Sequence, residues 1–192
     1  GHAKVNLTLY ETFHHYRAGV EECLKILKAA TLNVSVSDLA KDSHKLASFV
    51  GNYAHAELLK SWGIRPSAVV GLGRGKDVAT CVVGLAKLEV LLPQLASGVP
   101  VIDIPSGRSL GIEFSSIPSD CPDIEKRLRQ ILKSVTTQGV ECFVEIGLID
   151  PKLSVFCSQN ISKTSTWIST DPKHGLVGQL AQLYASGIKI DW

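Results

Sequence analysis

The sequence contains no methionine, and aromatic side chains make up only 6% of its 192 residues. No stretch approaches about 20 consecutive apolar residues, and the first residues lack the apolar core of a signal peptide. Lysine and arginine are spread along the chain without a basic run, and the formal net charge is only +2. This pattern does not indicate a nucleic-acid-binding surface. We therefore expect neither a membrane nor a nucleic acid as a partner.

The cysteines are few, widely spaced and odd in number: Cys23, Cys81, Cys121, Cys142 and Cys157. They resemble neither a disulfide framework nor a CxxC metal site, and they fit a reducing cytoplasm. No cofactor is predicted. The absence of even an initiator methionine indicates a piece cut from a longer polypeptide, with residues 3–192 as one domain and residues 1–2 as a cloning remnant.

The composition, 45% hydrophobic and 20% charged, suits one compact globular domain. Hydrophobic periodicity predicts helices at residues 16–30, 48–62, 77–98 (broken near Pro93), 123–135 and 175–187, the last with Tyr184 on its apolar face. Strands are predicted at 68–72, 99–104, 141–147, 154–157 and 165–170, whereas 112–117 is ambiguous. Apolar strands alternating with helices predict an α/β fold, with 68–72 as an inner strand of a parallel sheet.

A glycine-rich turn, GLGRGK, separates the strand at 68–72 from the helix that follows. A P-loop requires GxxxxGK followed by Ser or Thr, and both the spacing and Asp77 disagree with it. A dinucleotide-binding turn would need glycine where Lys76 stands. A nucleophile elbow, GxSxG, matches at Gly71 and Gly75 but has Gly73 in place of the serine. All three hypotheses fit only in part.

Further stretches occur in an order typical of one enzyme family: LYETFHHYRAGVEECLKIL, then NYAHAELLKSWGIRPSAVVGLGRGKD, then GVECFVEIG and LAQLYASGIKIDW. Together they resemble the acyltransferase domains of polyketide and fatty acid synthases, in which a helix ending SWGI-x-P leads into a strand and a GHSxGE elbow. The resemblance implies the large subdomain of those acyltransferases, which has an α/β-hydrolase-like core: a parallel sheet flanked by helices.

The resemblance also implies where the catalytic groups of the elbow would stand. Gly73 occupies the position of the acylated serine, Leu72 that of the preceding histidine, and Lys76 that of the following glutamate. Gly71 and Gly75 of the motif are retained. The elbow is therefore interpreted as vestigial.

Other positions of the family pattern are changed as well. Lys45 stands where a glutamine of the oxyanion hole is expected, and Gly98 where an arginine would pair with the malonyl carboxylate. Residues 99–139 are too few for the small ferredoxin-like lobe that carries the catalytic histidine, and they include no histidine. The first strand of the family, with its PGQG turn, is missing from this sequence. We therefore predict the large-subdomain core without the small ferredoxin-like subdomain, and no acyl transfer.

The function expected from this pattern is that of a catalytically inactive acyltransferase-like domain of a polyketide synthase, or of a related fatty acid synthase. It would act as a structural spacer or docking element beside domains such as a ketosynthase. The alternative is a binding module for an acyl carrier protein, its phosphopantetheine arm or a discrete, trans-acting acyltransferase. Arg74 and Lys76 would then bind an anion at the start of the helix.

The remaining candidates have structural interpretations that we favour. A relocated thiol nucleophile at Cys81 would need a neighbouring base to lower its pKa, and a small core residue is the simpler interpretation. His14 and His15 are expected at the surface of an early helix. His44 is expected in a solvated loop, and His55 is expected to pack along its helix.

Overall fold

The structure is a computed structural model, and it describes residues 4–41, 44–99, 106–109, 111–147, 150–169 and 175–191. Its helices are α1 (Leu7–Thr12), α2 (His14–Ala29), α3 (Val36–Lys41), α4 (Lys45–Ser61), α5 (Gly75–Val82), α6 (Leu88–Ala96), α7 (Ile124–Thr137), α8 (Pro151–Gln159) and α9 (Gly175–Ala185). Its strands are β1 (Ala68–Leu72), β2 (Gly107–Ser109), β3 (Ile112–Ile117), β4 (Cys142–Val144) and β5 (Thr166–Ile168). None of these helices has the length and apolar character needed to cross a membrane.

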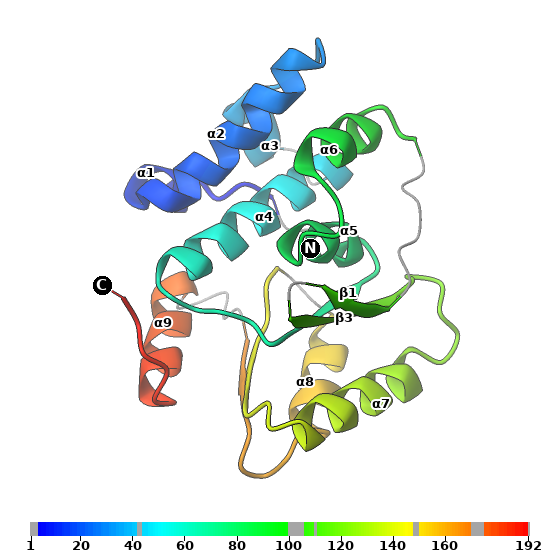
Figure 1. The fold of residues 1–192 in the computed structure, drawn as a ribbon. Coiled ribbons are helices and arrows are strands. Elements are labelled where there is room, and N and C mark those ends of the chain that lie inside the picture. Colours follow the sequence, from blue (N-terminus) through cyan, green and yellow to red (C-terminus); the bar gives the residue numbers. More distant parts are fainter. Residues whose placement is uncertain are drawn as a thin grey trace.

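The amino-terminal helices form a layer on one side of the strands (Figure 1). α2 and α4 pack closely because Gly19 lies against Ala54, where an added Cβ would be 3.0 Å from the Ala54 Cα. The helices predicted at 16–30 and 48–62 are confirmed as α2 and α4. Most of their predicted apolar faces are at most 1% exposed, namely Val20, Cys23, Leu27, Val50, Ala54 and Leu58, whereas Leu24 and Tyr53 are half-buried. Burying each such leucine or valine contributes about 1.5–3 kcal/mol, so this contact is the main core of the molecule.

The strands form two small sheets, ordered β1-β3-β2 and β4-β5. β1 pairs in parallel with β3, from Ala68 opposite Glu113 to Leu72 opposite Ile117, and β4 pairs in parallel with β5. β2 lies antiparallel on the other edge of β3. The predicted α/β class with parallel strands is confirmed, although the strands do not form the single sheet that was expected.

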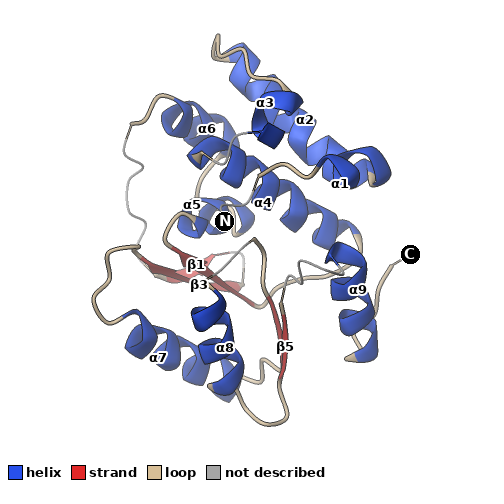
Figure 2. Ribbon diagram, turned by 180° about the vertical axis from the view of Figure 1, so that it is seen from behind, coloured by secondary structure: helices blue, strands red, loops and turns tan. Residues whose placement is uncertain are grey.

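Helices cover both faces of the larger sheet, as Figure 2 shows for α5 and α7. Phe114 packs against Ala79 of α5 and against Val83, which directly follows that helix, while Ile117 packs against Leu128 of α7. Positions an odd number of residues apart on a strand point to opposite faces, so one strand supplies both contacts. β1 is therefore held between helical layers, but it lies at the edge of its sheet among the described residues and not in the interior as predicted.

Two predicted elements are corrected by local helix signals. Residues 154–157 were expected as a strand but lie in α8, because Asp150 caps that helix by accepting from the Lys152 N–H and Pro151 occupies its first turn. The long apolar helix does not break near Pro93, which lies inside α6. It breaks earlier, between the end of α5 at Val82 and the start of α6 at Leu88, and the φ of 73° at Gly84 fits a left-handed helix terminus.

The other predictions have mixed outcomes. The ambiguous segment 112–117 is β3, and 165–170 contains β5 as expected. Tyr184 was placed on the apolar face of α9 but is 66% exposed, because the neighbouring Leu183 turns inward instead. The strand predicted at 99–104 lies almost wholly outside the described residues.

Candidate functional site

The glycine turn connects the end of β1 to the start of α5, which is the strand-turn-helix arrangement predicted for an elbow. Gly73 lies at its tip with a φ of 52°, in the left-handed region that favours glycine. The Gly73 N–H donates to the Ile117 carbonyl at 2.8 Å, and the Lys76 N–H donates to the Gly73 carbonyl at 3.3 Å. The turn is therefore held to β3 on one side and to its own helix on the other.

The flanking glycines of the motif have different structural roles. A Cβ at Gly71 would lie 2.4 Å from the Lys76 Cα and 3.0 Å from the Ala79 Cβ. A Cβ at Gly75 would meet no atom within 4 Å. Gly71 is thus required by the close approach of α5 to β1, whereas Gly75 is not required for packing.

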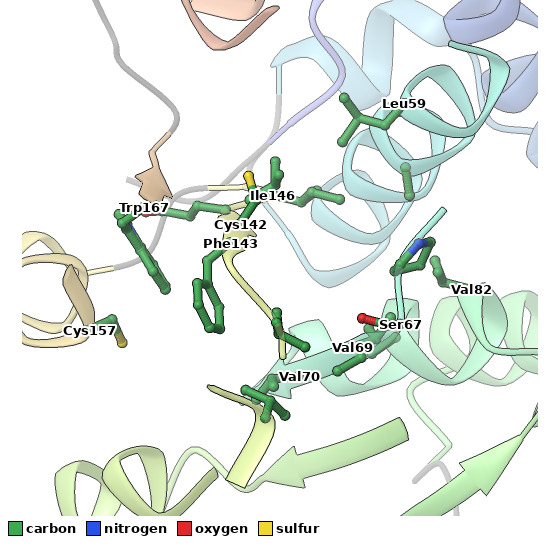
Figure 3. A pocket seen from close by; sticks show the side chains of 18 of the residues that line it. Leu59, Ser67, Val69, Val70, Val82, Cys142, Phe143, Ile146, Cys157 and Trp167 are labelled. Atoms are coloured by element: carbon green, nitrogen blue, oxygen red, sulfur yellow. The ribbon is translucent and has the colours of Figure 1, made fainter. Parts of the chain in front are cut away.

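A cavity of about 930 Å³ opens beside this turn and extends between the two sheets (Figure 3). Val69 and Val70 of β1 line it on one side, and Cys142 and Phe143 of β4 line it on the other. Gly75 and the exposed Arg74 reach its rim beside Ser119. Its size is within the range of small-molecule sites, about 300–1,000 Å³.

The structure does not bring the other vestigial positions to this cavity. Lys45 is exposed at the start of α4, and neither it nor Gly98 is among the described lining residues. Gly98 has a structural explanation, since its φ is 72° and it directly follows the end of α6. The Gly98 N–H donates to the Leu95 carbonyl, and the Val99 N–H donates to the Gln94 carbonyl. This pair of hydrogen bonds is the Schellman motif of a helix that ends at glycine.

Arg74 and Lys76, the two residues predicted to bind an anion, lie at the start of α5, but they differ in exposure. Arg74 is exposed, occupies the N-cap position without a side-chain cap bond, and borders the cavity. Lys76 is half-buried, has an interaction partner of its own, and does not line the cavity. Of the pair, Arg74 is the residue placed to meet a ligand at the rim.

Cys81 lacks the features of a relocated nucleophile. Burial, with a contribution from Asp77, raises the pKa of its thiol to about 11. Its side chain packs against the main core, and it is not part of the cavity lining described above. A thiol in these surroundings is protonated at neutral pH and is a poor nucleophile.

The histidines of the described ranges do not border the cavity beside the elbow. His14 and His15 are exposed on α2, as expected, and stack edge to face on each other. His44 is exposed in the bend before α4, as predicted, and it also caps that helix by accepting from the Ala47 N–H at 3.3 Å. None of the histidines in the described ranges lines the cavity.

Sequence reasoning missed a buried polar network behind β4. His55 Nε2 donates to the Gln179 Oε1 at 2.9 Å, and the Gln179 amide donates to the Glu145 carbonyl at 2.7 Å. The Glu145 carboxylate in turn accepts from the Ser154 hydroxyl at 2.9 Å, and Trp167 donates to the same hydroxyl. The network joins α4, α9, α8, β5 and the residue that directly follows β4. Glu145 belongs to the FVEIG stretch, which was the available signal.

Within the described part of the chain, no group of three or more histidine, cysteine, aspartate or glutamate side chains is placed to hold a metal ion. The described lining of the cavity offers mainly apolar contacts, together with the basic side chains of Lys60, Arg65 and Arg74 and scattered amide, hydroxyl, thiol and carboxylate groups. The buried Glu145 is already engaged by Ser154.

Comparison with known proteins agrees with this geometry. No family model matches the chain. It is 30% identical over 107 residues to an orsellinic acid synthase from Armillaria mellea, a match that covers 49% of this chain and 5% of that protein. The chain thus spans a small fraction of its curated relative. A solved structure of the acyl transferase domain of ZmaA matches all of this chain and 74% of its own, with a TM-score of 0.69 and 15% identity. The chain therefore has the fold of an acyltransferase domain, as its sequence motifs predicted.

Proposed function

We propose that this chain is a catalytically inactive acyltransferase-like domain of a polyketide synthase, or of a related fatty acid synthase, that serves as a spacer or docking element. One observation carries the proposal. The elbow is folded, with β1, a left-handed turn and α5 in place, but the residue at its tip is Gly73, which has no oxygen to accept an acyl group.

The surroundings of the elbow support the same conclusion. Ser119 offers the hydroxyl beside the tip, at 3.9 Å from the position a Gly73 Cβ would take. No histidine in the described ranges lines the cavity at which it lies, so no imidazole base meets that hydroxyl there. A serine is a weak nucleophile without an adjacent base, and the oxyanion donors contribute further orders of magnitude in rate.

Incubation with malonyl-, methylmalonyl- or acetyl-coenzyme A is expected to leave the intact mass of the protein unchanged. Gly73→Ser alone is expected to remain inert, because a nucleophile without its base and oxyanion donors loses most of its rate. An active acyltransferase domain treated in parallel provides the positive control. A stoichiometric, hydroxylamine-sensitive adduct on the wild-type protein would contradict the proposal, and mapping it to Cys81 would favour a relocated nucleophile.

The partner is expected to be another part of a synthase, such as a ketosynthase, because the curated relative is itself a synthase. The second candidate, a module that binds an acyl carrier protein or a discrete acyltransferase, is favoured by Arg74 at the cavity rim. Its guanidinium lies at the positive end of α5, where phosphate binds well.

Titration of the domain against a ketosynthase, a holo carrier protein and a discrete acyltransferase separates these candidates. We expect the ketosynthase to bind with a Kd in the micromolar range, which corresponds to a binding free energy of about −8 kcal/mol. Binding of the carrier protein that is lost in Arg74→Ala/Lys76→Ala but kept in Lys126→Ala/Arg127→Ala would favour the second candidate. The control pair lies on α7 and removes the same charge elsewhere. Absence of binding to all three would refute the docking role.

A further inference from the structure

The solvent-facing side of α7 carries a row of basic side chains. Lys126, Arg129 and Lys133 are all exposed, and they follow one another at intervals of three and four residues. Such intervals place side chains on one face of a helix, here about 10 Å from the first residue to the last at 1.5 Å per residue. Leu128 and Leu132 form the buried side of the same helix. We call Lys126, Arg129 and Lys133 the basic row.

The charge of the basic row is not balanced within the described part of the chain. None of its three members forms an ion pair with a described residue, and Glu125 is the single acidic residue of α7. Like charges three or four residues apart destabilise a helix by about as much as opposite charges stabilise it. The row therefore opposes the local stability of α7, and such exceptions to local consistency are expected at functional sites.

Arg129 is held in a fixed position by residues of α8 and the turn that follows it. Its guanidinium carbon lies 5.3 Å from the centre of the Phe156 ring, and its Nε donates to the Asn160 Oδ1 at 3.1 Å. The Asn160 amide is itself oriented, because its Nδ2 donates to the Phe156 carbonyl at 2.8 Å. The terminal nitrogens of Arg129 form no hydrogen bond with a described residue, so they can bind a carboxylate through two parallel hydrogen bonds. A side chain that is already ordered loses less entropy on binding.

α8 adds a further basic residue to this surface. Lys152 is exposed and lies one helical turn before Phe156, on the side of α8 that meets Arg129. α7 and α8 lie next to each other at the end of the molecule away from α2, as both Figure 1 and Figure 2 show. The positive charge around Arg129 therefore comes from two neighbouring helices.

The composition of the surface indicates the chemistry of its partner. The exposed neighbours of the basic row along α7 are polar: Gln130, Ser134 and Thr137. A surface of this kind binds through charge, which speeds association and makes binding sensitive to salt. The complementary surface is a helix with glutamate or aspartate at intervals of three and four residues. The formal net charge of the whole chain is only +2, so the row is a local feature and not a general excess of positive charge.

We propose that the basic row, extended by Lys152, is a docking surface for an acidic helix on a neighbouring synthase domain. The acidic helix lies along α7 and directs its carboxylates at Lys126, Arg129 and Lys133. The inference rests on the docking role proposed above and names the surface that performs it. This surface is separate from the rim at Arg74, because none of its four basic residues lines the cavity.

The first test compares two helical probe peptides, each titrated into the full chain and followed by NMR at low and at physiological salt. Both peptides contain alanine, glutamine and four glutamates. The glutamates of the first peptide follow one face at intervals of three and four residues, and those of the second are spread around the helix. We expect the first peptide to bind about tenfold more tightly at low salt and to shift the backbone amides of α7 and α8.

The second test removes the basic row with the variant Lys126→Gln/Arg129→Gln/Lys133→Gln. All three side chains are exposed, so the fold is expected to be unchanged. The Kd of the first peptide is expected to rise about tenfold, and that of the ketosynthase by a similar factor. Raising the salt concentration should reduce the difference between wild type and variant.

The matched control, Lys25→Gln/Lys28→Gln/Arg127→Gln, removes the same charge at exposed positions outside the row and is expected to change either Kd by less than about twofold. Equal binding of the two peptides, or equal weakening by the two variants, would show that only net charge is sensed and would overturn the proposal. A ketosynthase that binds wild type and row variant equally would overturn this surface but leave the docking role standing. Failure of the docking role gives a different result: the ketosynthase does not bind, whereas the first peptide still distinguishes the row variant from the control.

Discussion

Replacing Gly71 with alanine is expected to lower the free energy of unfolding by about 3 kcal/mol or more. The new Cβ would lie 2.4 Å from the Lys76 Cα and 2.8 Å from the Lys76 N, and neither is the movable end of a side chain. Relief would require α5 to move away from β1, although the Lys76 N–H is tied to the Gly73 carbonyl. Urea unfolding at equilibrium measures the change as a lower midpoint at constant slope.

Gly75→Ala is the matched control, three residues beyond the end of β1 in the same motif. Its Cβ meets no atom within 4 Å and Gly75 is not among the residues with positive φ, so alanine is expected to stabilise α5 by up to about 1 kcal/mol. Equal effects of the two substitutions would show that the close approach at Gly71 does not exist in solution.

Between pH 7 and pH 4 the protein is expected to lose about 3 kcal/mol of its free energy of unfolding through His55 alone. Burial lowers the pKa of this imidazole from 6.5 to about 4, against the opposing hydrogen bond to Gln179. As the pH falls below 6.5, the unfolded chain takes up this proton first. The folded state is therefore disfavoured until the pH reaches about 4, where the folded histidine also titrates.

His55→Gln removes the titrating group while its amide can still reach Gln179. The difference in stability between wild type and this variant should change by about 3 kcal/mol over the same pH window, whatever its value at pH 7. His14→Gln, on the surface of α2, is the matched control. Parallel pH profiles for wild type and His55→Gln would show that the folded protein accommodates a charged imidazole.

Local sequence signals predicted most of the elements and the identity of the fold. The apolar stripes of α2, α4 and α7 are spaced at the helical period, and the elbow motif follows an apolar strand, so both could be recognised without distant contacts. The errors came from local signals that were given too little weight. Gly84 ends a helix that Pro93 was expected to break, and Asp150 and Pro151 start a helix at a predicted strand.

The candidate site was predicted in part. The sequence by itself shows that Leu72, Gly73 and Lys76 stand in the elbow motif, because residue identity at a motif position is a property of the sequence. That they replace catalytic groups stays a prediction. The sequence did not reveal that Gly71 is indispensable and Gly75 is not. That difference depends on the distance between α5 and β1, which no local pattern records.

What the sequence alone determined is therefore most of the elements, their order and the identity of the residue at each position of the elbow motif. The tertiary structure decided which groups meet. It brought His55 to Gln179 across 124 positions of sequence, and it placed β1 and β4 on two sides of one cavity. The physical reason is that strand pairing and burial are set by contacts between distant segments, whose partners local propensity and periodicity do not specify.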